Sequence, residues 1–263
     1  KQKTAYEITY GDWSSDVCSS DLAGPLSIGQ AHVSGSWTVR LEEVRIVEGP
    51  NYLAETARLT VEGAGRTREV TAERVVRAPS DAAAGPLAPR VRITEDVTPD
   101  RVILRNEGLA GIIVGIAVEV NFHVTVPEST RLHLRTADGD ITVSHVAGMV
   151  VASSTRGAIQ ATGLRGGVDL RTSDGSISLD LADLSPEPVD LRTVNGGMTL
   201  TIPAGANASI DASSAKGKVD IAGLPVQMVG AQTARRTRVR LNDGGTPIQA
   251  ATTNGNIVIR PRP

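Results

Sequence analysis

Residues 168–179 read VDLRTSDGSISL, and residues 189–200 repeat the same pattern as VDLRTVNGGMTL. Four further copies lie between residues 132 and 259, and each copy has one glycine at the equivalent position. The six glycines are Gly139, Gly157, Gly175, Gly196, Gly217 and Gly255. The first four intervals between them are 18, 18, 21 and 21 residues, and a near-constant period of this size predicts a stack of repeats.

Apolar residues alternate with mostly polar ones on both sides of each glycine. In all six copies they occupy the positions seven and five residues before the glycine and two and four residues after it. A period of two is typical of strands that bury one face, so each copy predicts a strand, a corner and a second strand. Glycine is expected at the corner because it adopts positive φ without a steric clash.

A hydroxyl side chain lies three residues before the glycine in every copy. The six residues are Thr136, Ser154, Thr172, Thr193, Ser214 and Thr252. Their parity is that of the inward apolar residues, so they predict a ladder of hydroxyls that bond to the backbone of the corners.

Two all-β architectures fit this pattern. Asp-Gly between alternating runs is a strong signal for a β-hairpin, which would give an antiparallel meander. Hairpins, however, do not require residues of one type to recur at one offset in every copy, whereas a β-solenoid stacks equivalent offsets above one another. The pattern therefore favours a β-solenoid.

The chain divides into four predicted parts. Residues 1–22 resemble the translated read-through of a sequencing adapter and are expected to be a non-native, disordered tail. Residues 23–78 carry alternating segments separated by glycine-rich turns, which predict a small antiparallel β unit, and residues 79–89 have the composition of a linker. Residues 90–263 are predicted to form the solenoid, closed by a hairpin over residues 237–250.

Composition narrows the function classes. The formal net charge is −2, which gives no general case for nucleic-acid binding. All six aromatic residues lie at or before Phe122, so the repeats lack aromatic side chains on which sugars or bases could stack. Cys18 is the single cysteine, so neither an intrachain disulfide nor a cysteine-based metal site is expected. No secretion signal opens the sequence, and the longest uncharged apolar stretch, residues 108–118, is too short to span a bilayer as a helix.

Charged residues recur on the outward side of the repeats. Aspartate lies six residues before the glycine in three copies and arginine four residues before it in three; the residues are Asp169, Asp190, Asp211, Arg135, Arg171 and Arg192. Such a stripe binds calcium in pectate-lyase-type β-helices, but a solvated face with compensating charges is favoured, because alternating arginines oppose a cation. A basic run formed by Arg235, Arg236, Arg238 and Arg240 is expected to protect the last edge, with contact to an anionic partner as the alternative.

No convergent set of catalytic residues is visible. The four histidines show no metal-binding spacing, the serines lie outside a GxSxG motif, and no helix is expected after the glycines at 163–167 to form a phosphate site. We therefore expect no catalytic, metal-binding or cofactor-binding residues, and we predict that the protein is not an enzyme.

The segments LRTADGDITV, LRTSDGSISL, LRTVNGGMTLTIPAGANASIDASSAKGKV and TRVRLNDGGTPIQAATTNGNIVIR resemble the bacterial putative-adhesin domain family of unknown function. The resemblance covers about residues 90–261 and rests on the repeated T-x-N/D-G-x-I/V motif. It implies a right-handed β-solenoid at the cell envelope with no established enzymatic activity, and it assigns no functional residues. Residues 36–76 also resemble the periplasmic β-module of the haem-lyase subunit in cytochrome c maturation.

These features predict a non-catalytic cell-envelope solenoid that serves as an adhesin or surface scaffold. Its expected partners are other cell-surface proteins or glycans rather than nucleic acid, and membrane attachment is expected only through a segment that precedes residue 23. A carbohydrate-active β-helix enzyme of the lyase type is the alternative. For residues 23–78, the alternative is a cytochrome-maturation fragment in a chimeric reading frame.

Overall fold

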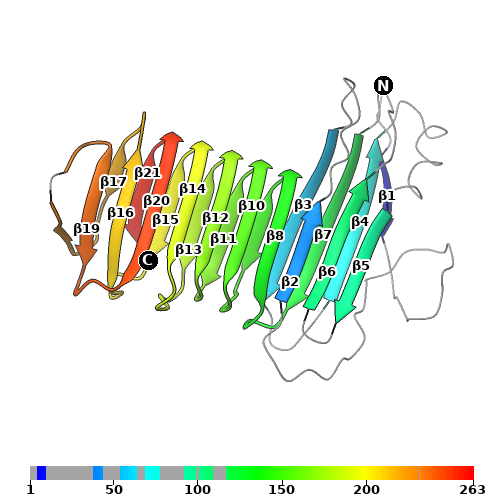
Figure 1. The fold of residues 1–263 in the computed structure, drawn as a ribbon, viewed down its shortest axis with the longest axis horizontal. Coiled ribbons are helices and arrows are strands. Elements are labelled where there is room, and N and C mark those ends of the chain that lie inside the picture. The colour runs from blue at the N-terminus through cyan, green and yellow to red at the C-terminus, as the bar shows by residue number, and fades with distance from the viewer. Residues whose placement is uncertain are drawn as a thin grey trace.

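The computed structural model of this chain describes residues 5–9, 38–43, 54–63, 69–77, 92–98, 101–108, 117–230 and 232–263. These residues form two sheets and no helix (Figure 1). The described residues accordingly include no helix able to cross a membrane. The all-β prediction is therefore confirmed.

Sheet A contains ten strands. In spatial order they are β1 (Ala5–Thr9), β4 (Glu69–Arg77), β7 (Ala117–Val126), β3 (Ala54–Gly63), β9 (Ile141–Ser144), β11 (Ile159–Leu164), β13 (Ile177–Leu181), β15 (Met198–Ile202), β21 (Ile257–Pro261) and β17 (Val219–Ile221).

Sheet B contains eleven strands. In spatial order they are β18 (Val226–Met228), β19 (Arg236–Leu241), β16 (Ala208–Ser214), β20 (Thr246–Asn254), β14 (Val189–Asn195), β12 (Val168–Asp174), β10 (Val150–Arg156), β8 (Arg131–Asp138), β2 (Thr38–Glu43), β6 (Arg101–Gly108) and β5 (Arg92–Thr98).

Each sequence repeat forms one layer of a β-solenoid. Its first strand lies in sheet B, the chain turns at the glycine, and its second strand lies in sheet A. Strands of successive layers pair in parallel, and equivalent residues are direct partners, such as Leu170 with Ala152 on one side and Leu191 on the other. In Figure 1 the repeat strands of sheet B point up at the front, and those of sheet A point down behind them. Successive layers of the first four repeats lie farther to the left, so the coil is right-handed.

The core lies between the two sheets. The alternating apolar residues of the repeats point into it, and both Leu170 and Leu191 are 0% exposed. The fifth repeat is the exception, because Val219 and Ile221 on β17 are only partly buried at the end of the stack. The inward and outward parities assigned from the sequence are confirmed.

The predicted hydroxyl ladder is present and joins one layer to the next. Thr172 donates its hydroxyl hydrogen to the carbonyl oxygen of Gly157 at 3.0 Å, and Thr193 donates to Gly175 at 2.9 Å. Ser154, Ser214 and Thr252 donate to corner glycines of the neighbouring layer in the same way. Each of these five hydroxyls therefore satisfies the carbonyl of a corner glycine in the neighbouring layer.

The reason for glycine at the corners differs from the one expected. Positive φ occurs at Gly139 and Gly157, at 151° and 153°, but not at the other four corners. A Cβ atom at Gly175 would instead lie 2.0 Å from the carbonyl oxygen of Gly157, and at Gly196 it would lie 1.9 Å from that of Gly175. Glycine is required mainly because stacked corners approach too closely for any side chain.

The order of layers in space departs from the order in sequence at the C-terminal end. The sixth repeat, β20–β21, lies between the fourth, β14–β15, and the fifth, β16–β17. The expected hairpin over residues 237–250 is wrong, because β16 lies between β19 and β20 and pairs with both. Residues 242–245 cross the start of β16, where Asn242 donates side-chain hydrogen bonds to the carbonyl oxygens of Ala204 and Ala206.

The N-terminal end shows the same rearrangement. Strands β2 and β3 form a layer between β6–β7 and β8–β9, and all four of these pairings are parallel. The predicted separate antiparallel unit over 23–78 is therefore wrong for β2 and β3, because their register continues that of the repeats. Among the described residues of this end, antiparallel pairing occurs only between β1 and β4, β4 and β7, and β5 and β6.

Two other predictions concern this end of the chain. The tail expected to be disordered includes β1, which pairs with β4, so the prediction is wrong for residues 5–9. The remainder of residues 1–22 and the predicted linker 79–89 lie outside the described residues.

Replacement of Gly175 by alanine tests the close stacking of the corners. We expect Gly175→Ala to lower the free energy of unfolding by on the order of 3 kcal/mol or more, because the new Cβ would overlap the backbone of Gly157. Gly205→Ala is the matched control, since no atom lies within 4 Å of its Cβ position. Equal denaturant midpoints for the two variants would contradict the stacking explanation.

Candidate functional site on the outer face of sheet B

Four of the predicted surface residues form one cluster in the middle of the outer face of sheet B. Asp169 and Arg171 lie on β12, and Asp190 and Arg192 occupy the equivalent positions on β14. Arg171 donates two hydrogen bonds to Asp169, at 2.7 and 2.9 Å, and lies 3.6 Å from Asp190, while Arg192 lies 2.9 Å from Asp190. We call these four residues the central quartet.

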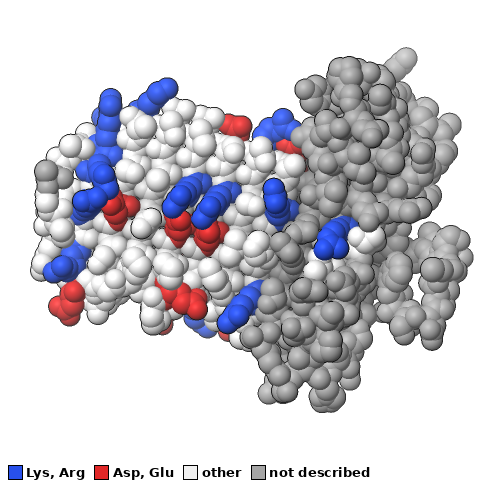
Figure 2. Space-filling model, in the orientation of Figure 1, with Lys and Arg blue, Asp and Glu red and all other residues white. Residues whose placement is uncertain are grey.

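The quartet is electrostatically balanced but remains accessible. The hydrogen bonds to Asp169 raise the pKa of the Arg171 guanidinium above its ordinary value. The side chains of Arg171 and Arg192 are 52% and 53% exposed, so solvent still reaches their remaining N–H groups. Two blue and two red groups side by side mark this cluster in Figure 2. It offers fixed donors and acceptors rather than a net charge.

The structure breaks the predicted stripe into separate clusters. Strand β20 lies between β14 and β16 and places Gln249 and Ala251 beside the quartet, which separates Asp211 from Asp190. On the other side, β10 places Ser153 between Arg171 and Arg135. The stripe is therefore not continuous. Ser153 replaces arginine in the second copy, which the sequence itself shows, whereas the insertion of β20 does not follow from the sequence order of the copies.

Asp211 anchors the second cluster. Its carboxylate accepts hydrogen bonds from Arg236 and Arg238 on β19, each with a shortest distance of 2.9 Å. The bond from Arg236 is the main reason that the pKa of Asp211 lies below its ordinary value, although partial burial opposes the shift. The other predicted basic residues of this run, Arg235 and Arg240, are exposed. The run lies at the start of β19, while β18 is the strand at this edge of sheet B, so protection of the edge by the run stays a prediction.

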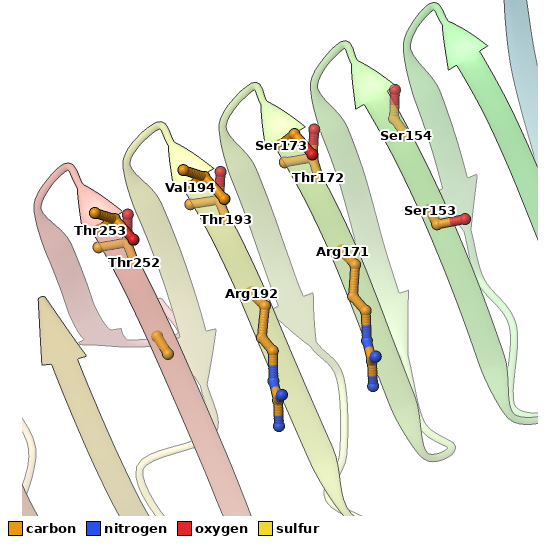
Figure 3. A pocket seen from close by; sticks show the side chains of 11 residues that line it. Ser153, Ser154, Arg171, Thr172, Ser173, Arg192, Thr193, Val194, Thr252 and Thr253 are labelled. Atoms are coloured by element: carbon orange, nitrogen blue, oxygen red, sulfur yellow. The ribbon is translucent and has the colours of Figure 1, made fainter.

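A shallow depression lies between the quartet and the corners. Its volume is about 330 Å³, and it extends over β10, β12, β14 and β20. Figure 3 shows Arg171 and Arg192 extending along the strands away from the corner. Ser154, Thr172, Thr193 and Thr252 lie near the corner, and Ser153 lies farther from it on β10. The lining residues are Ser153, Ser154, Arg171, Thr172, Ser173, Arg192, Thr193, Val194, Ala251, Thr252 and Thr253.

The lining determines what chemistry the depression can support. It contains hydroxyls and two guanidinium groups but no carboxylate, imidazole or thiol. The inward hydroxyls are already bonded to corner carbonyls. Within the described part of the chain, no three His, Cys, Asp or Glu residues come together as metal ligands would. The arrangement suits hydrogen bonding to a polar ligand better than proton transfer.

Sequence reasoning missed a polar ridge that runs along the corners. Residues directly before corner glycines contact their equivalents in neighbouring layers: Asn195 donates to Asp174 and Asn254 donates to Asn195, both at 2.6 Å. Arg156 forms an ion pair with Asp138 in the same row. The signal was available, because this offset holds Asp, Arg or Asn in five of the six copies, with lysine in the other.

The family described as Toastrack DUF4097 matches residues 119–260. No curated protein matches the sequence. A solved structure similar to the chain is a putative cell adhesion protein from Clostridium sporogenes ATCC 15579, with 12% identity, a TM-score of 0.44, and coverage of 98% of this chain and 100% of that one. A second is a putative adhesin from Bacteroides fragilis NCTC 9343, with 8% identity, a TM-score of 0.23, and coverage of 99% and 98%.

The ion pairs of Asp211 predict a contribution to stability that depends on pH. Because its folded-state pKa lies below the unfolded value, the contribution is present above the unfolded pKa and is lost as the pH falls through the folded pKa. We expect Asp211→Asn to lower the thermal midpoint at pH 7, and the difference from wild type to shrink below about pH 4.

Asp243→Asn is the control, since that exposed carboxylate forms no ion pair among the described residues. The explanation fails if the effect of Asp211→Asn is the same at pH 7 and pH 3.

Proposed function

This chain belongs to the Toastrack DUF4097 family, whose match covers more than half of its 263 residues, and on that premise we propose that it is a non-catalytic scaffold of the bacterial cell envelope. In this role the outer face of sheet B is the contact surface, and the central quartet with the adjoining depression is its centre. The partners would be other cell-surface proteins or glycans.

The observation that carries this proposal is the register of the outer face. Equivalent residues on β12 and β14 are direct partners, so their side chains repeat at the strand spacing of about 4.8 Å. Both strands lie in the interior of sheet B and are paired on either side, which fixes the backbone beneath the quartet. A rigid row of half-exposed donors and acceptors can bind an extended polymer or a flat protein surface with little ordering cost.

A location at the cell envelope is part of the same proposal. It is supported by the chain's resemblance to adhesin-like domains, because the repetitive outer face of sheet B suits a protein that binds the surfaces of other cells or molecules. No catalytic step is needed for this role.

The alternative, a carbohydrate-active enzyme of the lyase type, has less support. It would require a cleft with two or more carboxylates, or with a free lysine or arginine as base. The depression does contain Arg171 and Arg192, but each is held by an aspartate of the quartet, and no carboxylate lines it. Its open, hydroxyl-rich lining favours binding.

The alternative for residues 23–78, a cytochrome-maturation fragment in a chimeric frame, also has less support. Strands β2 and β3 continue the parallel register of β8 and β9, and Val61 on β3 is completely buried in the common core. Sequencing through the gene around residue 80 would reveal a junction if the two parts were joined artificially.

Replacement of the whole quartet by serine tests the contact surface. We expect the variant Asp169→Ser, Arg171→Ser, Asp190→Ser and Arg192→Ser to lose at least tenfold in binding to immobilised bacterial surface glycans and surface-protein extracts. The net charge is unchanged, so a loss would report the removal of specific hydrogen-bonding groups rather than of charge.

The control replaces Glu128 and Arg165 by serine, because this exposed ion pair lies at the opposite ends of the strands from the corners. Wild-type binding by the quartet variant would contradict the proposal. Cleavage of uronate polymers in the presence of calcium, abolished by Asp190→Ala, would establish the lyase alternative instead.

A further inference from the structure

Charge is distributed very unevenly along the chain. Residues 211–263 contain eight lysines and arginines and three aspartates, a net charge of +5. Residues 1–210 contain nineteen basic and twenty-six acidic residues, a net charge of −7. The overall value of −2 therefore conceals a strongly basic C-terminal part.

The basic residues gather at one end of the solenoid. The fifth repeat, β16–β17, is the last layer there, and β18 and β19 extend sheet B beyond it. Lys216 and Lys218 flank the corner of this layer, and Arg235 adjoins it, since the amide of Ser214 donates to the carbonyl oxygen of Arg235 at 2.8 Å. In Figure 2 the blue side chains concentrate at the left, where these strands lie.

Most of this charge is uncompensated. Arg236 and Arg238 share the single carboxylate of Asp211. Lys216, Lys218 and Arg235 are exposed and form no ion pair with any of the described residues. We call these three residues the basic corner. These exposed, unpaired charges create a positive electrostatic potential that extends about one Debye length, roughly 8 Å at physiological ionic strength.

Two large apolar side chains are exposed at the same end. Met228 is 65% exposed and Val229 is 44% exposed, and they are consecutive residues at the end of β18. Val229 lies beside Arg238, because its amide donates to the carbonyl oxygen of Arg238 at 2.9 Å, and Met228 is the partner of Val239 on the same strand, β19. Exposure of these two apolar side chains to water is unfavourable, which suggests a partner that offers an apolar phase.

We infer that this end of the solenoid binds the surface of an anionic lipid bilayer. Negatively charged headgroups attract the basic corner, and the acyl boundary beneath them accepts Met228 and Val229. An acidic polysaccharide would match the charge but offers no apolar phase for these two side chains. Single-stranded nucleic acid would need aromatic stacking residues, and all aromatic residues of this sequence lie at or before Phe122.

Binding to lipid vesicles tests this inference. The intact chain is expected to sediment with vesicles of mixed phosphatidylglycerol and phosphatidylcholine but not with phosphatidylcholine alone, and binding should weaken as salt rises. Each basic residue near an anionic surface contributes about fivefold, so Lys216→Gln, Lys218→Gln and Arg235→Gln together should weaken binding about a hundredfold.

The matched control removes three exposed charges from the first repeats, with Arg131→Gln, Arg135→Gln and Arg165→Gln. This variant has the same net charge as the basic-corner variant, so near-wild-type vesicle binding would show that position matters rather than total charge. Equal losses in both variants would overturn the assignment of the site.

A second variant separates a lipid surface from a soluble polyanion. Met228→Ser with Val229→Ser leaves the charge unchanged, and we expect it to weaken vesicle binding while leaving binding to soluble polyuronate unaltered. Wild-type vesicle binding by this variant, or tighter binding of the wild-type chain to polyuronate than to vesicles, would overturn the lipid assignment.

Discussion

The contact between stacked corners is the constraint from which the rest of the fold follows. At Gly175, Gly196 and Gly255 the neighbouring glycine carbonyl occupies the space that a Cβ atom would need, at 1.9–2.0 Å from its position. The same carbonyl accepts a hydroxyl hydrogen from Thr or Ser three residues before the next corner. The absent side chain and the hydroxyl together fix the distance and the register of adjacent layers, so the apolar residues on both strands of each layer meet their equivalents in the core.

These contacts depend on what a repeat contains and not on where it occurs in the chain. A corner with glycine and an inward hydroxyl can therefore stack on any other such corner. The C-terminal layer β20–β21 uses this freedom by inserting between β14–β15 and β16–β17, so Gly217 stacks on Gly255 rather than on Gly196. At the N-terminal end β2–β3 inserts between β6–β7 and β8–β9. Both insertions tie sequence-distant segments into one structure, which raises the entropy cost of forming these layers.

The local features of each repeat could be predicted from the sequence. The alternation around Leu170 and Leu191, the inward hydroxyls and the six corners follow from local patterns, and the structure confirms them. The order of the layers could not be predicted, because Ile248 and Ala250 carry the same pattern as Ile210 and Ala212 and fit either place. The same uncertainty affects the surface, because β20 separates Asp211 from the Asp and Arg residues of β12 and β14. The basic character of residues 211–263 could be found from charge counts alone, but the position of the basic corner and the exposure of Met228 and Val229 required the structure.

The most direct test of this account measures which layers are neighbours, with cysteine pairs in a Cys18→Ser background. Arg192, Ala251 and Ser213 point outward at equivalent positions on β14, β20 and β16. Adjacent strands lie about 4.8 Å apart, within the Cα range of a disulfide, whereas strands two layers apart lie about 9.6 Å apart and are beyond it. The account predicts rapid oxidation of the 192–251 and 251–213 cysteine pairs and none of the 192–213 pair. A disulfide between positions 192 and 213, with none between 192 and 251, would show that the repeats stack in sequence order and would contradict it.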